Sequence, residues 1–298
     1  MITEIDWITF HVIIGVLLLI DLLFHKKDHI QTFKEALIWS IIWIAAASIF
    51  ILYIFDKLGA AYSLEYTTAY VIEKMLSVDN LFVFAVIFAY FGIHKKYEHK
   101  ILFYGVIGAI VARAVFMVAG IHLLENFHFM TYIFGAVLIY TGIRLLRSRE
   151  MPTDPAKNPI IRYVKKVFPV VEEPSDRFIV RSGTIAVTPL FVTLIAVEST
   201  DILFAIDSVP AVLAVTDNLF VAYTSNIFAV LGLRSLYFLL INVLERLKYL
   251  HVGLFVLLLY LGAKMIASNF IEIPTVISLV IVASILTITT LISLKSHK

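Results

Sequence analysis

Two stretches decide the fold: EKMLSVDN at 73–80 and DILFAIDS at 201–208, each set inside a long apolar run. Aligned at a shift of 128 residues, they match polar residues one to one: Glu73 with Asp201, Asp79 with Asp207, and Asn80 with Ser208. Later matches follow at shifts of 121 and 120 residues: Arg113 with Arg234, Glu125 with Glu245, Tyr140 with Tyr260, Gly142 with Gly262, and Arg144 with Lys264. The pattern predicts an internal repeat whose two units carry matching polar residues.

The composition indicates that this repeat lies in a membrane. Of the 298 residues, 61% are hydrophobic and 15% are charged, whereas soluble domains usually contain about 25% charged residues. An ordinary soluble enzyme, a disordered chain and a nucleic-acid binder with a basic patch are therefore excluded. The net charge of +2 identifies no partner, and the absence of cysteine excludes disulfides, thiol catalysis and cysteine-ligated metals. We predict an all-α polytopic membrane protein.

Nine segments are long and apolar enough to span a bilayer core about 30 Å thick. They are 7–24, 38–55, 68–91, 101–124, 128–146, 189–215, 219–241, 250–268 and 274–294. Lys and Arg gather in the connections on one face, with Lys57 alone on the other, which predicts an external N-terminus and a cytoplasmic C-terminus in the cell membrane, plasma or inner. The first segment is expected to stay as an anchor, because its leader is acidic and His25-Lys26-Lys27 follows it.

The predicted organisation is a single transmembrane domain over 1–298. Its parts are peripheral helices over 7–55, a first repeat over 68–147, a cytoplasmic loop over 148–187, a second repeat over 188–268 and a ninth helix over 274–294. Because each repeat has three spans, the two must enter the membrane from opposite faces, as in transporters whose sites lie near the midplane. Within the loop, residues 177–187 (RFIVRSGTIAV) alternate around Ser182-Gly183 and predict a small hairpin.

Acidic residues within the helices that open the two repeats predict a cation site. The metal ligands are expected to be Glu73, Asp79, Glu198, Asp201 and Asp207, with Asn80, Ser208 and Asn226 as auxiliary ligands. Oxygen ligands suit hard divalent cations such as Mg²⁺, Ca²⁺ or Mn²⁺, and none of the nine histidines lies in 69–92 or 185–215. Crowded carboxylates also bind protons more readily than isolated ones, which offers a route to exchange a metal ion for H⁺.

Basic residues within the predicted spans offer a simpler interpretation, in which each acid is merely neutralised. They are Lys74, Arg113, Arg234 and Lys264. Five acids in two repeat-related motifs favour a cation site, so we interpret Arg113 and Arg234 as counter-charges that hold the site together when it is empty. Asp21 is either a residue at the mouth of the site or a solvated helix end. Pro210, three residues after Asp207, predicts a kink or break in the sixth span.

Three stretches resemble the TerC/Alx family of integral membrane proteins: EKMLSVDNLFVFAVIF, TPLFVTLIAVESTDILFAIDSVPA and SNIFAVLGLRSLYF. The resemblance covers about residues 10–270. It implies a multi-pass fold of two inverted three-helix repeats, related to the LysE-type exporters. Members of the family were named for tellurium resistance and pH response and are linked to manganese export. The resemblance places the family's intramembrane acids on the same five positions named above.

The function expected from these features is export of Mn²⁺ from the cytoplasm by proton antiport. Mn²⁺ and H⁺ would be the substrates in the lipid bilayer, with no permanently bound cofactor, no nucleic acid partner and no enzymatic activity. One alternative is an exporter of another cationic solute, such as an organic cation or a basic amino acid. An intramembrane aspartyl hydrolase would be expected to carry a Gly-x-Gly-Asp pattern, which the sequence lacks. Another alternative is a non-transporting membrane scaffold of a tellurite or metal-stress complex.

Overall fold

The computed structural model describes residues 2–24, 32–127, 129–147, 161, 163, 166, 168–170, 177–182, 184–240, 249–268, 270–271 and 273–295. The helices are α1 Glu4–Phe24, α2 Phe33–Leu58, α3 Ala60–Tyr90, α4 Lys95–Asn126, α5 Met130–Arg147, α7 Pro189–Leu213, α8 Leu219–Leu231, α9 Leu233–Leu240, α10 Leu250–Ala267 and α11 Thr275–Lys295. Two short strands, β1 Ile179–Ser182 and β2 Thr184–Val187, pair antiparallel with Ile179 opposite Val187. The predicted all-α membrane fold and its small hairpin are confirmed.

Six stretches of the described chain are long and apolar enough to cross a membrane, and they lie in α1, α2, α4, α7, the α8–α9 pair and α11. Helices α5 and α10 contain shorter apolar stretches, Met130–Ile143 and Val252–Ala267. Helix α3 is long but carries Glu65, Glu73, Lys74 and Asp79. The multi-pass architecture therefore stands, while the predicted count of nine spans is not confirmed.

The third and seventh predicted spans differ from the observed helices. Helix α3 begins at Ala60, eight residues before the predicted start, because Gly59 reverses the chain with a φ of 92° directly after α2. The seventh span is interrupted at Gly232, between α8 and α9. The break that Pro210 predicted in the sixth span is wrong, since α7 continues past Pro210 to Leu213. Pro210 lies in the last turn of α7, so one backbone hydrogen bond, to the carbonyl of Ile206, is missing while the helix continues.

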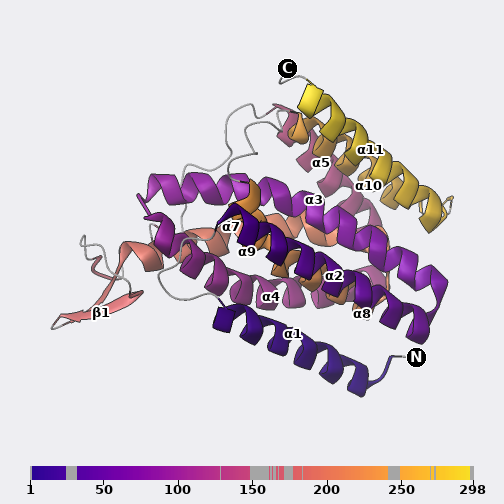
Figure 1. The fold of residues 1–298 in the computed structure, drawn as a ribbon. Coiled ribbons are helices and arrows are strands. Elements are labelled where there is room, and N and C mark those ends of the chain that lie inside the picture. The colour runs from indigo at the N-terminus through magenta and orange to yellow at the C-terminus, as the bar shows by residue number, and fades with distance from the viewer. Residues whose placement is uncertain are drawn as a thin grey trace.

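The helices lie side by side with the hairpin projecting from one end (Figure 1). Gly105 of α4 lies beside Val197 of α7, because a Cβ atom added at Gly105 would meet that residue. Further along both helices, a Cβ atom added at Gly120 would meet Leu213. Since the contacts advance along both helices together, α4 and α7 run in the same direction. Helix α3 reaches α4 through the short connection 91–94 and therefore runs opposite to α7. This is the relation that an inverted repeat requires, and the division of the chain into repeats remains a prediction.

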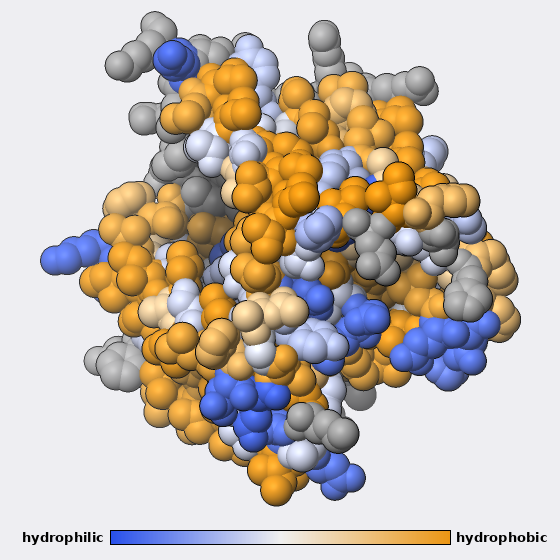
Figure 2. All heavy atoms as spheres, turned by 90° about the vertical axis from the view of Figure 1, so that its right-hand side faces the viewer, coloured by the Kyte–Doolittle hydropathy of each residue, from blue (hydrophilic) through white to orange (hydrophobic). Residues whose placement is uncertain are grey.

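Apolar side chains cover the outside of the bundle. Leu52 is 68% exposed on α2 and Val115 is 63% exposed on α4, as expected of side chains that face lipid. Figure 2, which shows the right-hand side of the view in Figure 1, is largely apolar with separate hydrophilic patches.

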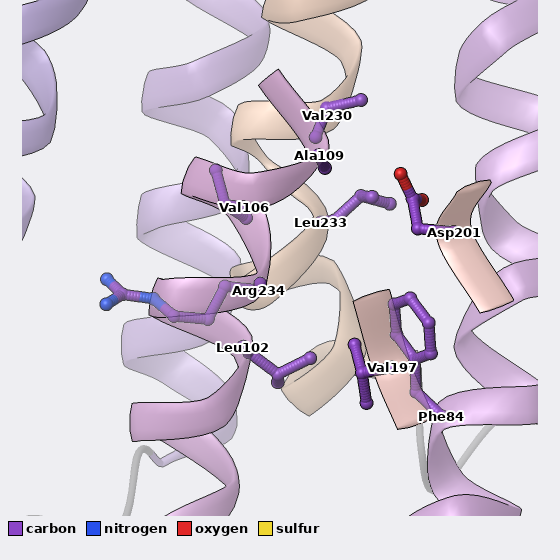
Figure 3. Close-up of a pocket in the computed structure, with 10 residues that line it drawn as sticks. Phe84, Leu102, Val106, Ala109, Val197, Asp201, Val230, Leu233 and Arg234 are labelled. Atoms are coloured by element: carbon purple, nitrogen blue, oxygen red, sulfur yellow. The ribbon is translucent and has the colours of Figure 1, made fainter. Parts of the chain in front are cut away.

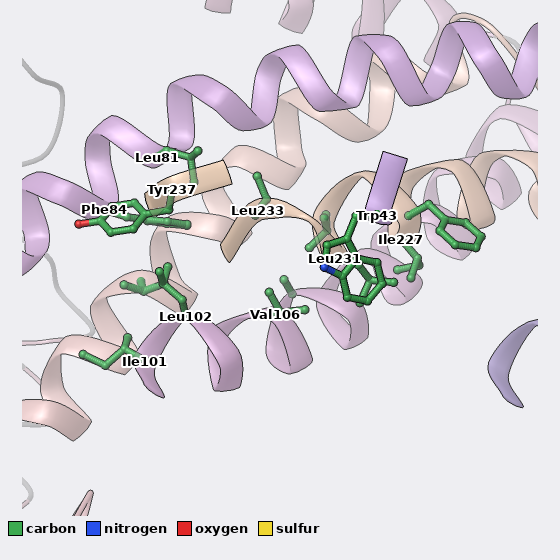
Figure 4. Close-up of a cluster of buried hydrophobic side chains, with 14 of the residues drawn as sticks. Trp43, Leu81, Phe84, Ile101, Leu102, Val106, Ile227, Leu231, Leu233 and Tyr237 are labelled. Carbon is green, nitrogen blue, oxygen red and sulfur yellow. The ribbon is translucent and has the colours of Figure 1, made fainter. Parts of the chain in front are cut away.

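Two buried hydrophobic clusters fill the interior. The first includes Trp43, Leu81, Leu102, Val106, Leu231 and Tyr237 (Figure 4). The second includes Ile72, Met117, Leu138, Ala205, Leu254 and Leu261. The helices α3, α4 and α7 contribute to both clusters, and Glu73, Arg113 and Asp201 lie between the two sets of residues along these helices.

Candidate functional site

The site lies at the boundary between the two hydrophobic clusters. On α4, Arg113 follows Ala109 of the first cluster and precedes Met117 of the second. Asp201 occupies the corresponding position on α7, and Glu73 lies near the middle of α3. Arg113 and Asp201 are close to the centres of helices that are long and apolar enough to cross a membrane, and Glu73 contacts Arg113, so the charges lie at the depth expected of the bilayer midplane.

Arg113 is fully buried and joins two of the acids that the repeat pairs. Its Nη1 donates to Oε1 of Glu73, while its Nε and Nη2 donate to the two carboxylate oxygens of Asp201 at 3.4 and 3.2 Å. The contact to Asp201 is the bidentate geometry in which a guanidinium binds a carboxylate most strongly. The matching acids of α3 and α7 thus both bind the guanidinium group of Arg113.

Neutral polar side chains complete this cluster. Nη1 of Arg113 also lies 3.2 Å from Oδ1 of Asn226 and 3.4 Å from Oγ of Ser208, and Ser77 donates to Glu73 at 3.4 Å. Oε2 of Glu73 and Nδ2 of Asn226 are buried without a hydrogen-bond partner in the described part of the chain. A buried carboxylate oxygen that lacks a donor is costly unless it binds a proton or a cation.

Glu198 is a third acid, placed between α4 and α7. It is half-buried, and its carboxylate occupies the space that a side chain at position 108 would need. It forms no hydrogen bond or ion pair with another described residue. Glu198 lies one helical turn before Asp201, so the two acids are neighbours on the surface of α7.

A small, largely apolar cavity adjoins the cluster, between α3, α4, α7 and the α8–α9 break. Its lining includes Phe84, Leu102, Val106, Val197, Asp201 and Leu233. In Figure 3 the Asp201 carboxylate lies at one side of the cavity, and Arg234, on the opposite side, directs its guanidinium away from it. One acid of the cluster therefore lines this partly open cavity.

The structure brings together some, not all, of the predicted site residues. Glu73, Asp201, Ser208, Asn226 and Arg113 form the cluster, and Asn80 is buried on α3. The side chains of Asp79 and Asp207 lie outside the described ones. Among the described side chains, no three of the acids and histidines form a group that could hold a metal ion.

Arg234 belongs to a second buried ion pair. Its Nη2 donates to Oδ1 of Asp21, and the two residues are 2% and 4% exposed. Asp21 lies on α1, outside both predicted repeats, so the repeat-related arginines have acids from different parts of the chain. Lys74, another basic residue of the interior, donates to the carbonyl of Ala229 at 2.9 Å.

Three further buried acidic groups were missed by sequence reasoning. Glu98, in the first turn of α4, is 7% exposed. It was missed because the basic connection around it predicted only the orientation of the protein in the membrane. Asp6 accepts hydrogen bonds from Tyr53 at 2.5 Å and from Thr3, and it pairs with Lys57 at 3.1 Å. The buried Oε2 of Glu65 has no partner in the described chain, and this residue was missed because the predicted third span began too late.

These features define a multi-pass integral membrane protein with a polar cluster in its interior. Residues 58–298 match the integral membrane protein TerC family, so the chain belongs to this family, as its motifs predicted. A Myxococcus xanthus relative, "Uncharacterized membrane protein STKORF319", is 41% identical over 94% of this chain and 89% of its own. Proteins named "Putative membrane-bound redox modulator Alx" are 38% identical in Photorhabdus laumondii, over 98% of this chain and 95% of the relative, and in Salmonella typhi, over 98% and 94%. No solved structure matches the chain significantly.

Proposed function

We propose that this protein exports Mn²⁺ from the cytoplasm in exchange for protons. The observation that carries the proposal is the convergence of Glu73 and Asp201, from matching positions of two helices, on a fully buried Arg113. Ionisable groups at the centre of a membrane protein are costly and mark ion pathways by default. One oxygen of Glu73 still lacks a donor among the described residues, so the cluster retains capacity for a ligand.

The charges of the cluster suit one divalent cation. When ionised, Glu73, Asp201 and the adjacent Glu198 carry three negative charges, and Arg113 returns one positive charge. These acids therefore leave an excess of negative charge, to which Asp79 and Asp207 would add, and such an excess favours a divalent cation. Protons neutralise the same carboxylates, so the metal and protons compete for them. Competition of this kind supports antiport.

The ligand chemistry supports a hard metal ion. Carboxylates, together with the amide oxygen of Asn226 and the hydroxyl of Ser208, are oxygen ligands of the type that Mn²⁺, Mg²⁺ and Ca²⁺ prefer. We assign Asp79 and Asp207 as further ligands from their positions in the two motifs. The small cavity beside Asp201 favours a single ion over an organic cation. Mn²⁺ as the cargo and export as the direction follow from the TerC/Alx resemblance and the predicted orientation.

The name of the Alx relatives concerns redox modulation. The sequence of this protein contains no cysteine, so a thiol–disulfide reaction is not available within residues 1–298. A change in cellular metal content is a route by which a transporter could influence redox state without redox chemistry of its own.

Mn²⁺ accumulation by inside-out membrane vesicles tests the proposed function. Vesicles from cells that produce the protein are expected to accumulate Mn²⁺ several-fold faster than vesicles from cells without it, because their lumen corresponds to the cell exterior. Competition with Mg²⁺ and Ca²⁺ in the same assay measures selectivity. Equal rates of Mn²⁺ accumulation in the two vesicle preparations would contradict a role in transport.

A further inference from the structure

We propose that Gly108 is a positioning residue that seats the carboxylate of Glu198 between α4 and α7. The inference rests on the proposed function, in which Glu198 is a cation ligand, and it adds a residue of α4 to the determinants of that site. Small residues spaced as Gly105, Gly108 and Ala112 are on α4 commonly allow close packing of helices. The contacts of the two glycines distinguish them.

Position 108 has room for a side chain only if the carboxylate of Glu198 moves away. A Cβ atom there would overlap both carboxylate oxygens of Glu198 and the carbon that joins them. At Gly105, one turn earlier on the same face of α4, a Cβ atom would lie 3.4 Å from Cγ1 of Val197 and 3.8 Å from Oε1 of Glu198, which are ordinary contacts. Both glycines lie beside α7. At position 108, and not at position 105, the carboxylate of Glu198 occupies the place of a Cβ atom.

The contact at Gly108 differs from those at Gly120 and Gly135, and from that at Gly232, whose ionisable neighbour Lys74 donates to the carbonyl of Ala229. At Gly120 the added atom would meet Leu213, and at Gly135 it would meet Ile266 and the backbone of Gly262. Those contacts join apolar or backbone atoms of neighbouring helices, as close helix packing requires. At Gly108 the neighbour is an ionisable group that has no hydrogen bond or ion pair with another described residue. The missing side chain therefore leaves the space that this carboxylate occupies.

The position of this carboxylate bears on cation binding. Glu198 precedes Asp201 by one turn on α7, and Asp201 is held by Arg113 on α4. Seating the Glu198 carboxylate against α4 keeps the two acids at the same interface and at a constant separation. A displaced Glu198 would alter the spacing of the ligands and leave the Arg113 ion pairs in place, so the expected defect is in apparent Mn²⁺ affinity.

The test compares Gly108→Ala with the matched control Gly105→Ala in Mn²⁺ flux measurements on reconstituted protein. Residues that support metal ligands typically change metal affinity by about 10–100-fold when altered, so Gly108→Ala is expected to raise the KM for Mn²⁺ at least about tenfold. Gly105→Ala is expected to stay within about twofold of the unaltered protein. Glu198→Asp, which shortens the acid by one methylene, is expected to recover most of the affinity when combined with Gly108→Ala.

A second measurement does not depend on transport. Dicyclohexylcarbodiimide, an apolar reagent that modifies membrane-embedded carboxyl groups, can be applied to the purified protein, and modification of Glu198 can be followed by mass spectrometry. The rate of modification is expected to rise several-fold in Gly108→Ala and to be unchanged in Gly105→Ala. Gly108→Ala could change the labelling rate although neither the unaltered protein nor any variant transports Mn²⁺. That result would support the positioning role of Gly108 and contradict the proposed function. Equal labelling rates and equal KM values in the two alanine variants would overturn the positioning role of Gly108. Failure of Glu198→Asp to recover the affinity of Gly108→Ala for Mn²⁺ would overturn it as well.

Discussion

Replacing Arg113 by methionine is expected to abolish accumulation of the folded protein. The substitution removes the buried guanidinium that joins Glu73 and Asp201, and it leaves two carboxylates uncompensated in the interior. Breaking a buried ion pair by removing one partner costs about 3–5 kcal/mol, a large fraction of the stability of a typical protein. Yield in the membrane fraction and the thermal unfolding midpoint in detergent measure the effect.

A combined variant separates charge from packing. In Arg113→Met with Glu73→Gln and Asp201→Asn, all three partners of the two ion pairs are neutral, so no broken pair remains and yield should recover. Transport should remain lost, because two proposed ligands are gone. Normal yield of the single Arg113→Met variant would show that the two acids do not depend on the arginine, contrary to the contacts described above.

Glu198→Gln is expected to abolish Mn²⁺ transport while the protein accumulates normally. Glu198 is not in an ion pair with a described residue, so neutralising it breaks no pair and leaves no buried base behind. Loss of one ligand charge weakens a hard-cation site directly, and we expect flux to fall by more than about tenfold, as for altered metal sites in general. Flux in proteoliposomes and yield are measured on the same preparation.

The matched control is Glu125→Gln, which neutralises an exposed acid near the end of α4. Flux of this variant should equal that of the unaltered protein. If Glu198→Gln transports Mn²⁺ at the unaltered rate, Glu198 is not a ligand. If Glu198→Gln fails to accumulate, its carboxylate has a structural partner that the proposal does not include.

Much of the fold was predictable because membrane helices are determined by the length of their apolar segments. The interruption of the seventh span was not, since an isolated glycine in an apolar run is tolerated within a helix and does not by itself predict a break. A Cβ atom at Gly232 would lie 2.6 Å from Nζ of Lys74 and 3.2 Å from Trp43, and both of these residues are far away in the sequence. A local pattern contains no information about such neighbours, whereas Pro210 is visible in the sequence and suggested the wrong span.

The candidate site was partly predictable, because its acids lie in two repeated sequence motifs. The repeat alignment matched Glu73 with Asp201, and the structure places both on Arg113. It could not reveal that Arg234 pairs with Asp21, because α1 lies outside the repeats and its packing against α9 is a tertiary contact. The alignment also could not distinguish Gly108 from Gly105, which differ only in what lies opposite them on α7.

Coupled flux in proteoliposomes tests the central claim, exchange of Mn²⁺ for protons, most directly. Purified protein is reconstituted with a pH-sensitive dye in an acidic lumen, and Mn²⁺ is added outside. We predict that Mn²⁺ accumulates inside against its gradient, that the lumen becomes alkaline only when Mn²⁺ is present, and that a protonophore stops the accumulation. If Mn²⁺ flux is unchanged with the pH gradient clamped at zero and follows the membrane potential alone, the protein is not an antiporter and the account is contradicted.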